Sequence, residues 1–402
     1  MSKFDRFENR AEVFFPRDDY NIEIKKSIFD FGQEKMDIWE AEHRLFSVHF
    51  EVTPKCNFRC VHCYLQKHHS DSELTLQEIV RILDELYDQG VLFITFTGGE
   101  VFSRPDFMNI YAYAKHKGFV IEIFTNGMLI NENIVSYFSS YPPLLVDISL
   151  YGASEATYRR VTGISGAFER VVENCKKLIA ANIRVALKSP MMTLTMPEIN
   201  DMKKLANEMG ITFRASFEII PGIDGDKATQ QYQLTNKEIL LYEFNEAVKH
   251  RESRVMSDSF QESGKESIDG LKSMRPLFRC KIGAGSCVID YAGNVFPCMK
   301  FRHIGKCLKD FSLSNIWEDF KKFQNAQASK SYKCLSCAAF RYCELCPAEM
   351  DFLYGDAERI DMIHCQLAHT RKAFYESGLS IQDAMAQYED WAVHIKNILE
   401  VK

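Results

Sequence analysis

Three cysteines with a CxxxCxxC spacing stand on one short stretch, CNFRCVHCYL, as Cys56, Cys60 and Cys63. A structural zinc site closes its coordination with four ligands, usually from two CxxC pairs that lie far apart in the chain. Three thiolates on one short loop leave a coordination position unfilled. The spacing therefore predicts a metal centre with one open position.

A second cysteine region lies between residues 280 and 365, and Cys175 stands alone between the two regions. In RCKIGAGSCVIDYAGNVFPC, twelve residues separate Cys280 from Gly293 and four more precede Cys298, and KCLSCAAFRYCELC follows with four cysteines. Paired CxxC motifs alone are typical of a zinc ribbon. Because disulfides are rare in the reducing cytosol, two cysteine clusters predict two metal-bearing regions.

Six short apolar runs predict buried strands at residues 47–53, 91–97, 119–125, 144–150, 183–189 and 211–217. Helical patterns separate them, and the first opens with a capping box between Thr75 and Glu78 and closes on Gly90. Six strand and helix units in succession predict an α/β fold with a parallel sheet and helices outside it. The sheet is either an incomplete barrel or an open doubly wound sheet. Ligands of both bind at the C-terminal ends of the strands.

Loops with ligand-binding character follow the first three predicted strands. The three-cysteine loop follows the first, TGGE at residues 97–100 follows the second, and TNG at residues 125–127 follows the third. Glycines there allow the backbone to approach a ligand closely. A single glycine pair after a strand is more often a tight turn than a binding site. Together on one edge, the three loops predict a site.

Polar residues in the predicted strands need a reason, because a strand buried on both faces is almost wholly apolar. Asp147 and Ser149 share one face of the fourth strand, Lys188 stands at the end of the fifth, and Arg214 lies in the sixth. If that face is the barrel interior, these side chains line its cavity. Internal ion pairs would give the same pattern at Asp147, Glu122 and Lys188.

Bulk composition narrows the class of protein. The 402 residues are 46% hydrophobic, enough for a sizeable core in two or three domains. The net charge of -6 gives no basic surplus for nucleic acid or for an anionic membrane. The start, MSKFDRFENRAEVFF, is too charged for a secretory signal, and no apolar run approaches the roughly 20 residues that span a bilayer. We expect a cytoplasmic protein.

With its cysteine loop and TGGE, the chain resembles the radical S-adenosylmethionine (SAM) superfamily, over roughly residues 47 to 217. Members carry CxxxCxxC after the first strand of a six-unit partial barrel and GGE after the second. The resemblance implies that Cys56, Cys60 and Cys63 are the catalytic cysteines, holding three irons of a [4Fe-4S] cluster while SAM chelates the fourth. Reductive cleavage of SAM then gives methionine and a 5′-deoxyadenosyl radical. The SAM-binding positions that it implies are His62, Tyr64, Gly98, Gly99, Glu100, Asn126, Ser149 and Lys188.

The second cysteine region resembles the SPASM domain, which carries auxiliary iron–sulfur clusters, over about residues 275 to 370. The resemblance implies two auxiliary [4Fe-4S] clusters, hence three clusters in all. The resemblance implies that the ligands of the first auxiliary cluster are Cys280, Cys287, Cys298 and Cys346. It implies that the ligands of the second are Cys334, Cys337, Cys343 and Cys365. One departure is visible: Cys343 and Cys346 leave two residues between them, where relatives usually leave three.

These resemblances imply a partial (βα)6 barrel at residues 47–250, a SPASM domain at 275–370 and a C-terminal helical segment at 371–402. The expected function is a radical SAM maturase that abstracts hydrogen from a ribosomally made precursor peptide, forming a crosslink or an altered residue. An external donor of the flavodoxin or ferredoxin type would supply electrons. The N-terminal extension, residues 1–46, is too short for the peptide-recognition domain of several relatives. Either a separate protein presents the peptide, or this enzyme binds it differently.

Two alternatives stay open. An anaerobic sulfatase-maturating enzyme would use the same core, but those relatives usually have an aspartate where this chain has Tyr151. A non-catalytic zinc-ribbon adaptor would explain the CxxC pairs but not TGGE or the six-unit core. Metal analysis that finds zinc without iron or acid-labile sulfide would favour the adaptor.

Overall fold

The computed structural model describes residues 37–65, 70, 72–252, 275–280 and 282–400. Within these residues one sheet has the strand order β6-β5-β4-β3-β2-β1-β7-β8-β9. The first six strands are parallel and follow chain order across the sheet, whereas a doubly wound sheet reverses its order. The partial barrel is therefore confirmed. Its strands are β1 (Ser47–Glu51), β2 (Phe93–Thr97), β3 (Val120–Thr125), β4 (Leu145–Ser149), β5 (Val185–Pro190) and β6 (Thr212–Ser216).

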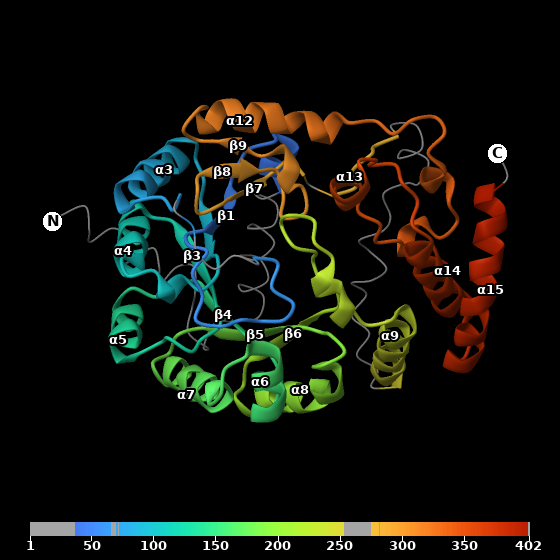
Figure 1. Ribbon diagram of the computed structural model, residues 1–402, viewed down its shortest axis with the longest axis horizontal. Coiled ribbons are helices and arrows are strands. Elements are labelled where there is room, and N and C mark those ends of the chain that lie inside the picture. Colours follow the sequence, from blue (N-terminus) through green and yellow to red (C-terminus); the bar gives the residue numbers. More distant parts are fainter. Residues whose placement is uncertain (1–36, 66–69, 71, 253–274, 281, 401–402) are drawn as a thin grey trace, which may run out of the picture.

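Helices cover the outside of the curved sheet (Figure 1). The first begins at the predicted capping box, in which Thr75 accepts from the Glu78 N–H and Glu78 accepts from the Thr75 N–H. The helices of this layer are α3 (Leu76–Asp88), α4 (Phe107–Lys117), α5 (Glu132–Ser140), α6 (Glu155–Thr162), α7 (Ala167–Ala180) and α8 (Ile199–Glu208).

The two faces of the barrel strands differ in polarity. Val48 pairs in register with Ile94, and both belong to the hydrophobic core beneath the helices. The next residues along these strands, His49 and Thr95, also pair in register, and they lie on the opposite face of the sheet. The same register places Glu122, Asp147, Lys188 and Arg214 on that opposite face. Polar side chains therefore line the barrel interior, as the strand parity predicts.

A seventh strand, β7 (Ser286–Ile289), extends the barrel sheet and was not predicted from the sequence. It lies parallel to β1, and Cys287 pairs in register with Val48. The antiparallel strands β8 (Asn294–Phe296) and β9 (Lys306–Cys307) complete the sheet. The sheet thus runs without a break from the barrel into the cysteine-rich region.

The C-terminal part is mainly helical, with α12 (Leu313–Phe320), α13 (Pro347–Tyr354), α14 (Met362–Ser377) and α15 (Ile381–Glu400). Helix α14 begins within the range expected for SPASM and continues past residue 371. It packs with α15 and with α9 (Asn236–Glu252), and Phe244 and Phe374 stack there at 3.9 Å between ring centroids. No helix in the described part of the chain is both long and apolar enough to cross a membrane. Of the expected N-terminal extension, residues 1–36 lie outside the described residues.

Candidate active site

The three cysteines of the first motif lie together on the loop after β1. Burial raises the pKa of Cys56 to about 11, and the neighbouring Cys63 thiol contributes to that rise. Burial also raises the pKa of Cys60, with further contributions from Cys63 and Cys56. Cys56 Sγ accepts a hydrogen bond from the Phe58 N–H at 3.3 Å. Partly buried thiols that resist ionisation alone suit a cationic iron cluster, because its charge stabilises the thiolates.

The spacing of these thiols bears on the kind of metal they could hold. In the described part of the chain, no three ligating side chains converge closely enough to hold a single metal ion. Each ligand of a four-iron cluster bonds a different iron, so its thiolates need not converge on one point. Three thiols on one loop are therefore compatible with such a cluster.

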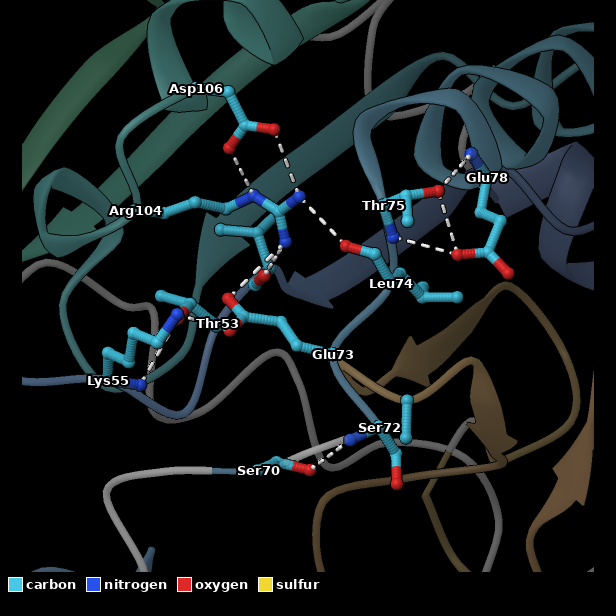
Figure 2. A network of polar contacts seen from close by, with 12 residues as sticks. Thr53, Lys55, Ser70, Ser72, Glu73, Leu74, Thr75, Glu78, Arg104 and Asp106 are labelled. Carbon is cyan, nitrogen blue, oxygen red and sulfur yellow. Dashed lines mark hydrogen bonds and ion pairs between the residues drawn. The ribbon is translucent and has the colours of Figure 1, made fainter.

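Arg104 holds the two ends of the cysteine loop together (Figure 2). Its Nη1 donates to the Val52 carbonyl at 2.9 Å, where β1 ends, and its Nη2 donates to the Leu74 carbonyl at 2.8 Å, just before α3. Asp106 pairs with its Nε at 2.7 Å. Arg104 is buried, so these partners satisfy an otherwise costly charge. Nothing in the surrounding sequence distinguishes this arginine from one on the surface.

The two glycines of TGGE pack against the start of the cysteine loop. A Cβ on Gly98, whose φ is +138°, would lie 2.3 Å from the Thr53 carbonyl oxygen. A Cβ on Gly99 would lie 2.3 Å from the Lys55 carbonyl oxygen. The Gly99 N–H donates to the Thr53 carbonyl at 2.8 Å. Both positions therefore require glycine for contact with the loop backbone, a reason separate from the predicted contact with SAM.

Glu100 links TGGE to TNG. Its buried carboxylate accepts hydrogen bonds from Thr125 Oγ1 at 2.6 Å and from the Asn126 N–H at 2.7 Å. Burial raises the pKa of Glu100 to about 6, and these hydrogen bonds oppose the rise. The side-chain amide of Asn126 donates through Nδ2 to Asn57 Oδ1 at 2.8 Å. The same Nδ2 lies 3.8 Å from Cys56 Sγ. The three predicted loops thus meet at the cysteine group.

His62 presents an unpaired nitrogen beside this group. Its ring lies 5.3 Å from that of Tyr151, between centroids. Among the described residues, its buried Nδ1 has no hydrogen-bond partner, and the same holds for Asn57 Nδ2. Burial lowers the pKa of His62 to about 4, so the ring is neutral near pH 7. Unsatisfied buried polar atoms cost free energy, so this corner fits a polar ligand such as the adenine of SAM.

A charged cluster lies on the interior face of β4, β5 and β6. Fully buried Asp147 accepts from Arg214 Nη2 at 2.5 Å and lies 3.3 Å from Lys188 Nζ. Burial lowers the pKa of Lys188 to about 8, and Asp147 opposes that change. The Lys188 ammonium lies over the Phe124 ring, 2.8 Å from its centroid. Asp147 and Lys188 therefore form an ion pair inside the barrel, which was one of the two explanations for polar residues in these strands. Ser149 on β4 pairs in register with Lys188 on β5.

The cysteines predicted for the first auxiliary cluster do not all come together. Burial raises the pKa of Cys298 to about 11, and the thiols of Cys346 and Cys280 add to it, so these three are neighbours. Cys287 is fully buried on the helix-facing side of β7, within the main hydrophobic core. Burial alone raises its pKa. The structure does not place Cys287 with the other three predicted ligands.

The four cysteines predicted for the second auxiliary cluster influence one another electrostatically. Burial raises the pKa of Cys365 to about 12, and the thiols of Cys334, Cys343 and Cys337 contribute. These four therefore lie close together. The two unassigned cysteines lie elsewhere, Cys175 buried in α7 and Cys307 in β9.

Tyr64, the residue after Cys63, points to a second charged pair. Its hydroxyl donates to Glu51 Oε1 at 2.9 Å, and Arg302 makes two hydrogen bonds to the same carboxylate. Neither Glu51 nor Arg302 was singled out from the sequence. Glu51 could have been singled out from the sequence, because it is a charged residue in a strand predicted to be buried. Arg302 carried none, since its partner lies 251 residues away.

Family models match both cysteine-bearing regions. Residues 50–209 match the Radical SAM superfamily, and residues 280–347 match SPASM, an iron–sulfur cluster-binding domain. The chain therefore carries a radical SAM domain followed by a SPASM domain. It is an enzyme whose domains imply SAM and iron–sulfur clusters as cofactors.

Three curated relatives share about a quarter of their residues with this chain. An AdoMet-dependent heme synthase of Methanosarcina barkeri is 27% identical over 76% of this chain and 92% of its own length. The mycofactocin maturase MftC of Mycobacterium ulcerans is 28% identical over 73% and 80%, respectively. The subtilosin biosynthesis protein AlbA of Bacillus subtilis is 26% identical over 67% and 57%.

Solved structures of similar fold are more distant in sequence. Streptococcus suis SuiB bound to the precursor peptide SuiA has a TM-score of 0.64 at 16% identity, covering 90% of this chain and 87% of that chain. Native anSMEcpe with bound AdoMet and the Kp18Cys peptide has a TM-score of 0.61 at 15% identity, covering 86% and 99%. At such identities the likeness shows a shared fold.

Proposed function

We propose that this protein is a peptide maturase that abstracts hydrogen from one residue of a ribosomally made precursor peptide, leaving a crosslink or an altered residue. The observation that carries the proposal is the position of the cysteine loop. It lies at the C-terminal ends of parallel strands, beside a polar barrel interior and joined to the SPASM region through Glu51. Ligands of parallel α/β folds bind at that end. The names of the relatives MftC and AlbA describe a maturase and a bacteriocin biosynthesis protein.

The residues of this chain would bind and orient the reactants. Cys56, Cys60 and Cys63 would hold a [4Fe-4S] cluster, which with SAM supplies the 5′-deoxyadenosyl radical. His62 would contact the adenine through its unpaired nitrogen. Hydrogen abstraction needs the substrate carbon held in contact with the radical, so orientation matters more than acid–base strength. Lys188 would contribute that orientation from the barrel interior.

The remaining cofactors and partners belong to the same proposal. Two auxiliary [4Fe-4S] clusters in the SPASM region would accept an electron or bind the substrate, giving three clusters per chain. An external flavodoxin or ferredoxin would reduce the SAM-binding cluster. A separate recognition protein would present the precursor unless the enzyme binds it differently. The SAM contacts of Gly98, Gly99, Glu100, Asn126 and Ser149 remain predictions.

A second candidate is a reaction on a heme precursor. The M. barkeri heme synthase supports it, because this chain covers 92% of that relative's length at 27% identity. The two candidates differ in the substrate that receives the radical and not in the SAM chemistry. One experiment can therefore separate them.

The test follows one hydrogen atom. Reconstituted enzyme, SAM and a reductant are incubated with a candidate precursor peptide, such as one encoded by a neighbouring gene, carrying deuterium at the modified residue. We expect mass spectrometry to find deuterium in 5′-deoxyadenosine and a matching mass change in the peptide. A parallel reaction receives a heme precursor instead.

Two outcomes would contradict the proposal. Modified peptide without deuterium in 5′-deoxyadenosine would exclude abstraction from that position. Consumption of the heme precursor, with every tested peptide unchanged, would favour the second candidate.

A further inference from the structure

One buried carboxylate is shared by the two cysteine-bearing regions. Glu51 is fully buried at the end of β1, on the interior side of the barrel sheet. Its Oε1 accepts a hydrogen bond from the hydroxyl of Tyr64, the residue that directly follows Cys63. Its two oxygens also accept from Arg302 Nη2 at 2.5 Å and from Arg302 Nη1 at 3.0 Å. Such a bidentate pair is strong and fixes orientation as well as distance.

Arg302 in turn is tied to the turn that carries Cys298. Its Nε donates to the carbonyl of Met299, the residue after Cys298, at 3.2 Å. Its guanidinium also stacks over the Tyr64 ring at 5.5 Å from the centroid. A chain of direct contacts therefore runs from Cys63 through Tyr64, Glu51 and Arg302 to the backbone beside Cys298.

Arg302 borders a cavity between the two regions. Tyr64 lines it from the cysteine loop, Pro221 and Ile223 from the segment after β6, and Lys300, Arg302 and Glu349 from the SPASM region. Lys300 pairs with Glu349 at 3.0 Å and also contacts Glu218. The charged side chains in the cavity wall are thus already paired.

The charge of Glu51 also reaches the cysteine loop. It accepts a hydrogen bond from Tyr64 at 2.9 Å, and Tyr64 directly follows Cys63, so the carboxylate lies beside the cysteine loop. An uncompensated negative charge there would disfavour adding an electron to anything that the loop binds. The Arg302 guanidinium supplies the compensating positive charge at hydrogen-bond distance.

We propose that Glu51 and Arg302 form a positioning pair, which fixes the SAM-cluster loop relative to the first auxiliary group and neutralises the buried charge beside Cys63. The pair acts through Tyr64 and the Met299 backbone and touches no reacting atom. The positioning half of the proposal rests on the proposed peptide function. The charge half rests only on a cluster being bound at the cysteine loop.

The test measures the reduction potential of the SAM-binding cluster, identified as the one whose EPR signal changes when SAM is added. Compared with wild type, Glu51→Gln should raise this potential, because it leaves the arginine charge unopposed. Arg302→Gln should lower it, because it leaves the carboxylate unopposed. Arg302→Lys keeps the charge and should stay near wild type. Shifts of the same sign in E51Q and R302Q, or no shift in either, would overturn the proposal.

A matched pair elsewhere controls for general loss of stability. Arg371 on α14 makes two hydrogen bonds to Glu243 on α9, at 2.7 and 2.9 Å, and is buried to a similar degree as Arg302. Arg371→Gln should leave the SAM-cluster potential unchanged. A shift in R371Q equal to that in R302Q would assign the effect to destabilisation and overturn the charge role.

The second measurement is the ratio of modified peptide to 5′-deoxyadenosine. R302Q should lower it about tenfold or more, since small misplacements at a reacting centre have effects of this size. R302K should restore part of it. A ratio in R302Q equal to that of wild type would overturn the positioning role. Because the potential needs no peptide, failure of the peptide function itself would leave the charge test intact.

Discussion

The SAM-cluster loop and the first auxiliary group each bring three thiols together, but by different means. Cys56, Cys60 and Cys63 lie on one loop whose two ends are joined by Arg104. Cys280, Cys298 and Cys346 come from three separate segments of the cysteine-rich region. Local spacing therefore defines the first group, whereas tertiary packing defines the second. A cysteine at suitable spacing, such as Cys287, can still be directed into the core.

The largest expected effect comes from removing the local group. If these thiolates hold the SAM-binding cluster as proposed, changing Cys56, Cys60 and Cys63 together to Ala should abolish reductant-dependent SAM cleavage. On the proposed count of three clusters of four irons each, the iron content should fall by about a third from about 12 per chain. Iron and sulfide analysis and a deoxyadenosine assay check both. Unchanged iron in the triple variant would sink the ligand assignment.

The next effect separates the members of the auxiliary group. Cys298→Ala should lower iron content by up to about a third, because in the proposed assignment it removes a ligand of one of three clusters. Cys287→Ala should leave iron content unchanged, since the Cys287 side chain packs in the main hydrophobic core on the helix-facing side of β7. It should cost only about 1 kcal/mol of unfolding free energy, as a small core truncation. Equal iron loss in both variants would show that Cys287 is a ligand after all.

Much of the fold was predictable because it depends on short-range patterns. The six barrel strands are apolar runs, and the α3 capping box is readable from Thr75 and Glu78. The three loops after β1, β2 and β3 followed from strand order alone. The SPASM region was recognisable from the spacing of its cysteines, and the four cysteines predicted for the second auxiliary cluster lie near one another.

What escaped prediction depends on contacts between distant residues. Strand β7 has only four residues, SCVI, and is defined by pairing with β1 from the far end of the chain. Arg302 became significant only through Glu51, 251 residues earlier. Cys287 has the residue type and spacing of a ligand, and only its burial on the helix-facing side distinguishes it. Spacing specifies which residues are available but not which way they point.

A third prediction tests whether the local loop is self-sufficient. Arg104→Met should lower the free energy of unfolding by about 3 kcal/mol or more, because it strands the Asp106 carboxylate and two buried carbonyls. SAM cleavage should fall with it. The control is Lys55→Ala, which removes a half-exposed ion pair to Glu73 and should cost under about 1 kcal/mol. Denaturant unfolding compares the two variants. Equal losses of unfolding free energy would mean that Arg104 does not stabilise the protein by joining the two ends of the cysteine loop.

The smallest expected effect lies in the barrel interior and depends on pH. Burial lowers the pKa of Lys188 to about 8 from its ordinary 10.5, although Asp147 opposes the change. The folded protein therefore loses this proton above about pH 8, while the unfolded chain keeps it up to about 10.5. Because the unfolded state binds more protons in that window, this lysine opposes folding below pH 8, and its penalty is relieved as pH rises from 8 to 10.5.

The same titration should appear in catalysis if the Lys188 charge orients the substrate. The ratio of modified peptide to 5′-deoxyadenosine should fall severalfold above about pH 8, as the ammonium above Phe124 becomes neutral. Lys188→Arg should keep its charge throughout and show no such fall, since a guanidinium does not titrate in this range. The measurement is a pH series of product and deoxyadenosine for both proteins. A parallel decline in wild type and K188R would place the titrating group elsewhere and leave substrate orientation to Arg214 and the rest of the interior.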